Sequence, residues 1–284
     1  MELNITARRE GRLSSFLKGE LKMSTGLMNR LKWGDAIRVN GTLRHTDFSV
    51  RPGDVITVRL DEPAAEYPAQ EGPLTVLYED DHILAVDKPS GMLIHPSRSK
   101  NEGTLANYVL GYYERTGQKA AFHPVTRLDR DTFGVVLLAK NSHIHSLLQQ
   151  TALRKTYRAP VFGGPEADRG IIDAPIARRP LPSLLRYIGP EGKPSVTEYE
   201  ALRRDAGTTL LALRPITGRT HQLRLHCCYM GWPILGDPQY FTEESKAYSD
   251  NLGLGHQLLC AYSLEFTHPV TDAQIRITTQ MDIK

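Results

Sequence analysis

Hydrophobic residues near the start of the chain follow helical spacing and then change to strand spacing. Residues 13–21 carry leucine and phenylalanine at intervals of three and four, and residues 27–31 repeat that pattern. Both segments are predicted to be short helices. Asn40–Gly41 is a typical hairpin turn, and residues 55–60 alternate apolar with polar side chains as a half-buried strand does. The pattern predicts a small α+β unit over residues 1–60.

The remainder of the chain mixes short apolar runs with a few helical patterns. Five runs predict strands: 74–78, 83–86, 135–138, 157–162 and 210–213. Two segments, 105–113 and 143–153, have helical spacing. Strands with scattered helices favour an α+β fold with a mixed sheet.

Residues 61–73 separate these two parts of the chain. They are rich in proline and acidic residues and have no hydrophobic period, which is typical of a linker. The predicted division is therefore 1–60, a linker over 61–73, and a larger domain over 74–284.

Charge is distributed unevenly between these parts. The chain has 284 residues and a net charge of +3, yet the segment from Arg8 to Arg59 holds eleven basic and five acidic residues. A small basic unit on a near-neutral body indicates an anionic polymer as partner. An ordinary solvated surface explains the charge alone equally well.

The other bulk features favour a cytoplasmic protein. Three cysteines form no even framework and no C-x-x-C motif, which is typical of a reducing compartment. The start of the chain lacks the apolar core of a signal peptide, and no run approaches the roughly 20 apolar residues that span a bilayer. The adjacent Cys227 and Cys228 do not have the spacing of a metal site, so we expect no metal.

The segment from His123 to Gly134 carries the first candidate for chemistry. Arg127, Leu128 and Asp129 stand just before a Thr-x-Gly turn and an apolar run. In extended backbone Arg127 and Asp129 share a face while Leu128 points into the core. Asp129 is then either a turn residue in a structural ion pair or a carboxylate that a nearby arginine holds ionised for nucleophilic work.

Three further segments carry basic or aromatic groups. In residues 215–226, Arg219, His221 and Arg224 suit phosphate or carboxylate contact, and Gly218 permits an unusual backbone angle. Tyr157 lies between Lys155 and Arg158 and could stack on an unpaired base, although a strand tyrosine is more often a core residue. The rigid loop from Asp87 to Pro96 is expected to expose Lys88 and His95 to a ligand.

These four segments, in this order, closely resemble the RluA-type family of RNA pseudouridine synthases over about residues 74–282. The matching motifs are Lys88-Pro-Ser-Gly91 with His95-Pro96, Arg127-Leu-Asp129 with Thr132 and Gly134, Lys155 to Ala159, and Gly218 to His226. The sequence departs from the family pattern at Thr126 and Phe133, which flank Asp129.

Residues 1–60 resemble the small S-four-like RNA-binding domain, named after a ribosomal protein. The helix pair, the turn at Asn40–Gly41 and the Pro52–Val55 ending carry this shorter match. The resemblance implies that Arg30 and Lys32 contact RNA.

The family resemblance implies a fold and a reaction. The fold is a mixed, largely antiparallel central sheet flanked by helices, and the reaction isomerises uridine in RNA without a cofactor. Asp129 is implied as the catalytic carboxylate, Arg224 as its basic partner, and Tyr157 as a stacking residue that helps deprotonate the rejoined base. The implied RNA contacts in this part of the chain are Lys88, Arg127, Arg130, Arg219 and His221.

Ribosomal RNA is favoured as substrate over transfer RNA, and we expect a monomer. Two alternatives stay open at this point. One is a non-catalytic RNA-binding factor for ribosome assembly. The other is a glycosidase that pairs Asp129 with Asp131 or Asp87.

Overall fold

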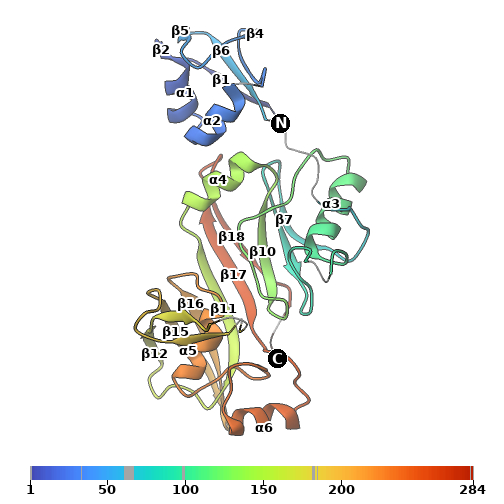
Figure 1. Ribbon diagram of the computed structural model, residues 1–284, viewed down its shortest axis with the longest axis vertical. Coiled ribbons are helices and arrows are strands. Elements are labelled where there is room, and N and C mark those ends of the chain that lie inside the picture. The colour runs from blue at the N-terminus through green and yellow to red at the C-terminus, as the bar shows by residue number, and fades with distance from the viewer. Residues whose placement is uncertain are drawn as a thin grey trace.

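The computed structural model describes residues 2–32, 34–60, 67–97, 100–180, 183, 185–281 and 283. Residues 2–60 form a small unit, the N-terminal module, at one end of the molecule (Figure 1). Its elements are β1 (Glu2–Thr6), β2 (Gly11–Arg12), α1 (Leu13–Gly19), α2 (Thr25–Lys32), β3 (Ile37–Val39), β4 (Thr42–Leu43), β5 (Ser49–Val50) and β6 (Val55–Arg59). The order of strands in its main sheet is β1-β6-β3-β4.

The two predicted helices and the hairpin of the module are confirmed. Ser24 caps α2, because its hydroxyl accepts a hydrogen bond of 3.2 Å from the Leu27 amide. Asn40 and Gly41 both have positive φ angles, 50° and 77°, as a two-residue hairpin turn requires. The sequence reading missed β1, which pairs with the whole of β6 although its side chains are only partly buried.

The module has its own apolar core. Phe16, Leu17, Val50 and Ile56 are completely buried in a cluster that consists of module residues. Residues on the helices thus pack against the inner face of the small sheet, and this burial is the main term that stabilises such a unit.

The main body begins at residue 67 and contains a sheet of ten strands among the described residues. Its strands are β7 (Thr75–Glu79), β8 (Ile83–Lys88), β9 (His123–Pro124), β10 (Phe133–Ala139), β11 (Arg154–Phe162), β12 (Arg169–Asp173), β15 (Val196–Asp205), β16 (Thr208–Pro215), β17 (Cys260–Thr267) and β18 (Gln274–Thr278). A separate ribbon is made of β13 (Ile176–Arg178) and β14 (Arg186–Ile188). The helices are α3 (Leu105–Arg115), α4 (Ser142–Gln150), α5 (Gln222–Tyr229) and α6 (Glu243–Asn251).

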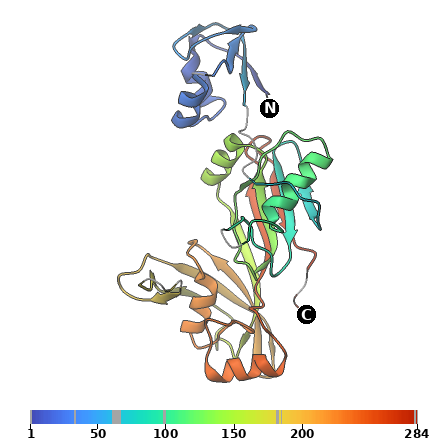
Figure 2. The same ribbon diagram turned by 45° about the vertical axis from the view of Figure 1, so that its right-hand side comes forward.

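The long sheet runs in the order β12-β15-β16-β11-β17-β10-β8-β7, and β17 lies between its two halves. β17 pairs with β11 in antiparallel and with β10 in parallel, the latter over only Phe133 and Gly134. The two halves therefore diverge on either side of β17, as the turned view in Figure 2 shows. The predicted α+β fold with a mixed, largely antiparallel sheet is confirmed, as are the predicted strands and helices of this part.

Only part of the predicted linker can be compared with the structure, since residues 61–66 lie outside the described residues. The second half packs on α3. The Gln70 amide donates to the Asn107 carbonyl at 3.0 Å, and Asn107 Nδ2 donates to the Pro68 carbonyl at 2.8 Å. Residues 67–73 are thus tied to the main body.

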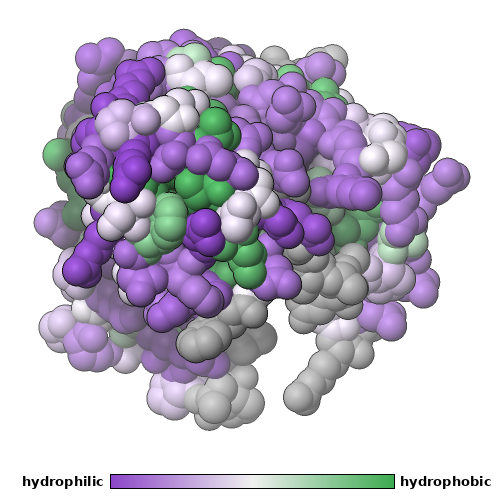
Figure 3. Space-filling view, turned by 90° about the horizontal axis from the view of Figure 1, so that it is seen from above, coloured by the Kyte–Doolittle hydropathy of each residue, from purple (hydrophilic) through white to green (hydrophobic). Residues whose placement is uncertain are grey.

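The module meets the main body near α4. Arg30 Nη2 donates to Ser142 Oγ at 3.0 Å. Beside this contact lies a cleft of about 680 Å³, which the module lines with Lys18, Lys22 and Thr25 and the main body lines with Gln150, Thr151 and His268, among others. Viewed from the module end, hydrophilic side chains cover most of the surface around a smaller hydrophobic area (Figure 3).

Within the described part of the chain, none of the helices combines the length and apolar character that crossing a membrane would require.

Candidate active site

Asp129 lies in a tight turn that leads into β10. The Thr132 amide donates to the Asp129 carbonyl at 3.2 Å and the Phe133 amide donates to the Leu259 carbonyl at 3.2 Å. Thr126, a departure from the family pattern, is buried, and its hydroxyl accepts from the Leu137 amide at 2.9 Å. Both ends of the loop are therefore fixed to the sheet, while the Asp129 side chain stays 36% exposed.

Lys88 holds this loop from the end of β8. Its side chain is completely buried, and Nζ donates to the carbonyls of Pro89, Met92 and Arg130 at 3.0, 2.9 and 2.8 Å. The expectation that Lys88 is exposed to a ligand is wrong, because three backbone acceptors use the three N–H groups of its ammonium. Burial lowers the pKa of Lys88 to about 8. Ser90 adds a hydrogen bond of 2.9 Å to the Asp131 carbonyl.

Gly134 allows the loop to enter the sheet. Its φ angle is +107°, and a Cβ there would lie 2.3 Å from the Ala261 carbonyl oxygen. Only glycine fits both the angle and the close approach of β17. This contact sets the position of the Asp129 turn relative to the central strand.

Arg224 reaches Asp129 from α5. Its Nη1 lies 3.3 Å from Asp129 Oδ2, and its side chain is only 5% exposed. The same guanidinium is held on its other side by Asp237, with Nε to Oδ2 at 2.6 Å and Nη2 to Oδ1 at 2.7 Å. A buried carboxylate that accepts two hydrogen bonds in this way holds a desolvated guanidinium in place.

His221 lies beside the same carboxylate. Its Nε2 is 3.8 Å from Asp129 Oδ2, and its Nδ1 is 3.0 Å from the Tyr240 hydroxyl. Burial lowers its pKa, so the neutral imidazole predominates at neutral pH. The unusual backbone angle expected at Gly218 occurs at His221, where φ is 56° at the start of α5.

Tyr157 approaches the site from β11. It pairs with Ala261 of β17, the residue that also pairs with Gly134, so the sheet brings β11 and the Asp129 turn to the same strand. The register shifts between Thr156 and Tyr157, and such bulges often re-aim side chains beside active sites. Burial, together with the charge of Asp129, raises the pKa of Tyr157 to about 12.

The remaining predicted RNA contacts are exposed and fall into two groups. Arg127, Arg130 and Arg219 belong to the segments that form the site, and Arg30 and Lys32 belong to the module. Arg130 is 63% exposed and forms a bidentate pair with Asp131 at 2.9 and 2.8 Å.

The glycosidase alternative requires Asp131 or Asp87 as a second carboxylate, and both of these residues have other partners in the structure. Asp131 is paired with Arg130, and Asp87 is buried and accepts from the Thr279 hydroxyl and the Gln280 amide at 2.6 and 2.8 Å. The sequence analysis did not identify Asp237 and Tyr240, which stand among glycines and prolines in residues 231–240. The available signal was an aspartate set after the apolar residues Ile234 and Leu235.

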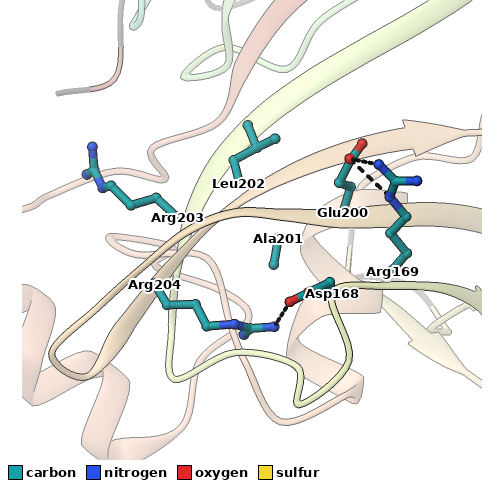
Figure 4. Close-up of a pocket in the computed structure, with 7 residues that line it drawn as sticks. All are labelled: Asp168, Arg169, Glu200, Ala201, Leu202, Arg203 and Arg204. Atoms are coloured by element: carbon teal, nitrogen blue, oxygen red, sulfur yellow. Dashed lines mark hydrogen bonds and ion pairs between the residues drawn. The ribbon is translucent and has the colours of Figure 1, made fainter.

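A hollow of about 420 Å³ lies on β12 and β15, four strands or more from β10 in the sheet (Figure 4). Four of its charged residues pair with one another, with Arg169 on Glu200 and Arg204 on Asp168 at 2.5 and 2.8 Å. The hollow therefore has no part in the Asp129 site.

Comparison with known proteins agrees with this geometry. The RNA pseudouridylate synthase family matches residues 82–229. An RNA pseudouridine synthase of Bacillus subtilis is 34% identical over 91% of each chain. The ribosomal large subunit pseudouridine synthase C of Vibrio cholerae is 30% identical over 95% of this chain and 90% of its own. Its counterpart D from Xanthomonas campestris is 36% identical over 87% and 77%.

Solved structures show the same fold. The human RNA pseudouridylate synthase domain containing 1 has a TM-score of 0.61 at 24% identity and covers 75% of this chain and 86% of its own. The human RNA pseudouridylate synthase domain containing 4 has a TM-score of 0.58 at 23% identity and covers 73% of this chain and 88% of its own. The chain belongs to the RluA-type family of RNA pseudouridine synthases, which are isomerases of uridine in RNA.

Proposed function

We propose that Asp129 is the carboxylate that starts this isomerisation. The reaction breaks the bond between the ribose and N1 of uracil, turns the base, and joins the ribose to C5. The hydrogen on C5 leaves as a proton and N1 gains one, so no redox partner is required. The supporting observation is the short distance between Asp129 and Arg224, 3.3 Å, with one group buried and the other open to substrate.

Arg224 and Tyr157 have different roles in this proposal. Arg224 orients Asp129 and offsets part of its negative charge. Tyr157 stacks on the detached base and accepts the C5 proton at the end. With its pKa raised to about 12 the resting phenol is neutral, so Tyr157 gives its own proton to N1 of the base and takes the C5 proton in exchange.

We also propose ribosomal RNA as the substrate and the N-terminal module, of the S-four-like type, as an RNA-binding unit. Two relatives carry the name ribosomal large subunit pseudouridine synthase. The module presents exposed lysines along the cleft that it shares with the main body. A uridine must leave its stack to reach Asp129, at a cost of a few kcal/mol, and phosphate contacts offset that cost.

Tritium release from C5-labelled uridine tests this proposal. Unmodified ribosomal RNA and transfer RNA are treated separately with wild type, Asp129→Ala and Tyr157→Phe. Release from ribosomal RNA by wild type, none by Asp129→Ala, and slow release with intact binding by Tyr157→Phe are expected. Tritium release by Asp129→Ala would contradict the proposed role of that carboxylate. Equal rates for Tyr157→Phe and wild type would contradict the proposed proton transfer by Tyr157. Release from transfer RNA alone would contradict ribosomal RNA as the substrate.

A further inference from the structure

Arg224 divides its hydrogen bonds unequally between two carboxylates. A guanidinium has five N–H donors. Nε and Nη2 are directed to the segment after α5, where Asp237 accepts at 2.6 and 2.7 Å and Gln239 Oε1 accepts at 2.9 Å. Nη1 is the nitrogen that faces Asp129, at 3.3 Å. Asp237 is thus the tighter partner.

Burial reinforces this inequality. The Asp237 side chain is fully buried, with 0% exposure, whereas that of Asp129 is 36% exposed. Attraction between charges is stronger in the protein interior than at a wet surface. The positive charge of Arg224 is therefore neutralised mainly by Asp237, and it neutralises only part of the negative charge of Asp129.

Asp237 itself cannot move easily. Its Oδ1 also accepts the amides of Gln239 and Tyr240 at 2.9 and 3.1 Å. The turn before it contains Gly236, with a φ of +75°, where a Cβ would lie 2.2 Å from the His256 carbonyl oxygen. Four donors and a turn that only glycine fits hold this carboxylate in place.

We propose that Asp237 is a positioning residue for the reaction: it holds Arg224 against Asp129 and matches most of its charge, so that Asp129 faces the substrate as an only partly neutralised anion. The other nearby groups fit this role. His221 is neutral at neutral pH and Tyr240 lies with its ring 5.2 Å from the guanidinium carbon. Two carboxylates around one arginine leave one negative charge, and Asp129 is the more exposed of them.

This inference rests on the proposed roles of Asp129 and Arg224, and a double-mutant cycle tests it. Tritium release is measured in single turnovers at neutral pH for wild type, Asp237→Asn, Arg224→Met and the combined variant. In Asp237→Asn, Asp129 is the one carboxylate among the described residues that Arg224 still contacts. We expect turnover to fall about 100-fold and RNA binding to change less than about threefold, because the reaction and not the binding of RNA depends on the position of Asp129.

The combined variant separates positioning from mere support of the fold. If Asp237 acts through Arg224, its substitution has no further effect once Arg224 is gone, and the combined variant turns over within about threefold of Arg224→Met. Multiplied losses, or wild-type turnover in Asp237→Asn, overturn the inference and leave the proposed function intact. Wild-type turnover by Arg224→Met instead overturns the proposed role of Arg224.

The double-mutant cycle remains informative even if one of the single variants does not fold. Asp237→Asn leaves a buried guanidinium without its main partner, whereas the combined variant replaces the buried pair with neutral groups. If Asp237→Asn does not fold, Arg224→Met and the combined variant still decide the question. A combined variant that is folded, binds RNA and is more than about tenfold slower than Arg224→Met overturns the inference.

Discussion

The candidate catalytic centre and the N-terminal module place their charges in opposite ways. In the centre, Lys88, Arg224 and Asp237 are buried, and each is held by three or more hydrogen bonds. In the module, Lys18, Lys22 and Lys32 are exposed, on a unit with its own core. The first arrangement holds each charged group in one position, and the second presents positive charge at the surface of the module.

The difference predicts how each region responds to substitution. Groups that share partners lose function together, so their effects are not additive. Exposed cations act on an RNA backbone almost independently, so their effects should add and depend on salt. Four substitutions, from the largest expected effect to the smallest, test this contrast.

Gly134→Ala should have the largest effect. The new Cβ would lie 2.3 Å from the Ala261 carbonyl at a φ of +107°, and strain together with overpacking should cost about 3–5 kcal/mol of unfolding free energy. Urea unfolding with tritium release measures both stability and activity. The control is Gly207→Ala, whose φ is +80° with no atom within 4 Å, and which should cost about 1–2 kcal/mol. Equal costs would show that the approach of β17 is unimportant.

Lys88→Met should come next. Three buried carbonyls lose their donor, which should cost about 2–4 kcal/mol. The pKa of Lys88 is about 8 in the fold against 10.5 ordinarily, so between these values the unfolded chain binds more protons and stability rises with pH. The gap between wild type and Lys88→Met should widen by about 2 kcal/mol from pH 7 to 9.5. Urea unfolding at both pH values measures this difference in stability, and a difference that stays constant would contradict the lowered pKa of the buried Lys88.

Replacing Lys18 and Lys22 with glutamine should weaken RNA binding about tenfold and leave single-turnover rates at saturation unchanged. Loss of two phosphate contacts should lower the slope of log affinity against log salt by about 1.5. Filter binding at several salt concentrations measures this. Arg203→Gln, which removes an exposed charge paired with Asp205 on β15, should change neither quantity. An unchanged slope in the double variant would mean that the cleft does not contact RNA.

Ser142→Ala should have the smallest effect. It removes the acceptor of the hydrogen bond from Arg30, and an exposed bond of this kind contributes less than about 1 kcal/mol. We expect kcat/KM on the RNA substrate to change less than about twofold. A loss above tenfold would show that the position of the module on α4 is part of catalysis.

Local patterns predicted most of the fold. The helices near Leu13 and Leu105, the hairpin at Asn40–Gly41 and the apolar strands were found because their spacing or turn chemistry depends on near neighbours in sequence. β1 was missed, since its partly buried side chains leave a weak pattern and β6 decides its pairing. The parallel pairing of β10 with β17 joins residues far apart in the chain and left no local signal.

The site was predicted less evenly. The sequence pointed to Asp129, Tyr157 and Arg224, and the fold places Asp129 and Tyr157 beside β17 and Arg224 on α5 within 3.3 Å of Asp129. It misplaced Lys88, because a lysine in a Pro/Gly loop has the same local appearance whether it faces solvent or backbone carbonyls. It missed Asp237, whose importance depends on a partner that only tertiary packing places beside it.

The position of β17 has a consequence for synthesis of the protein. The Asp129 turn and Tyr157 belong to strands on either side of β17, yet β17 begins only at Cys260. A nascent chain that has reached α6 holds the Asp129 turn and Tyr157 on two separate half-sheets with open edges. Insertion of this late strand closes both edges at once, so the enzyme cannot become active while its own ribosome is still translating the first 259 residues. Protease digestion of ribosome-stalled chains ending before and after β17 would follow that step, and early protection of both halves would contradict it.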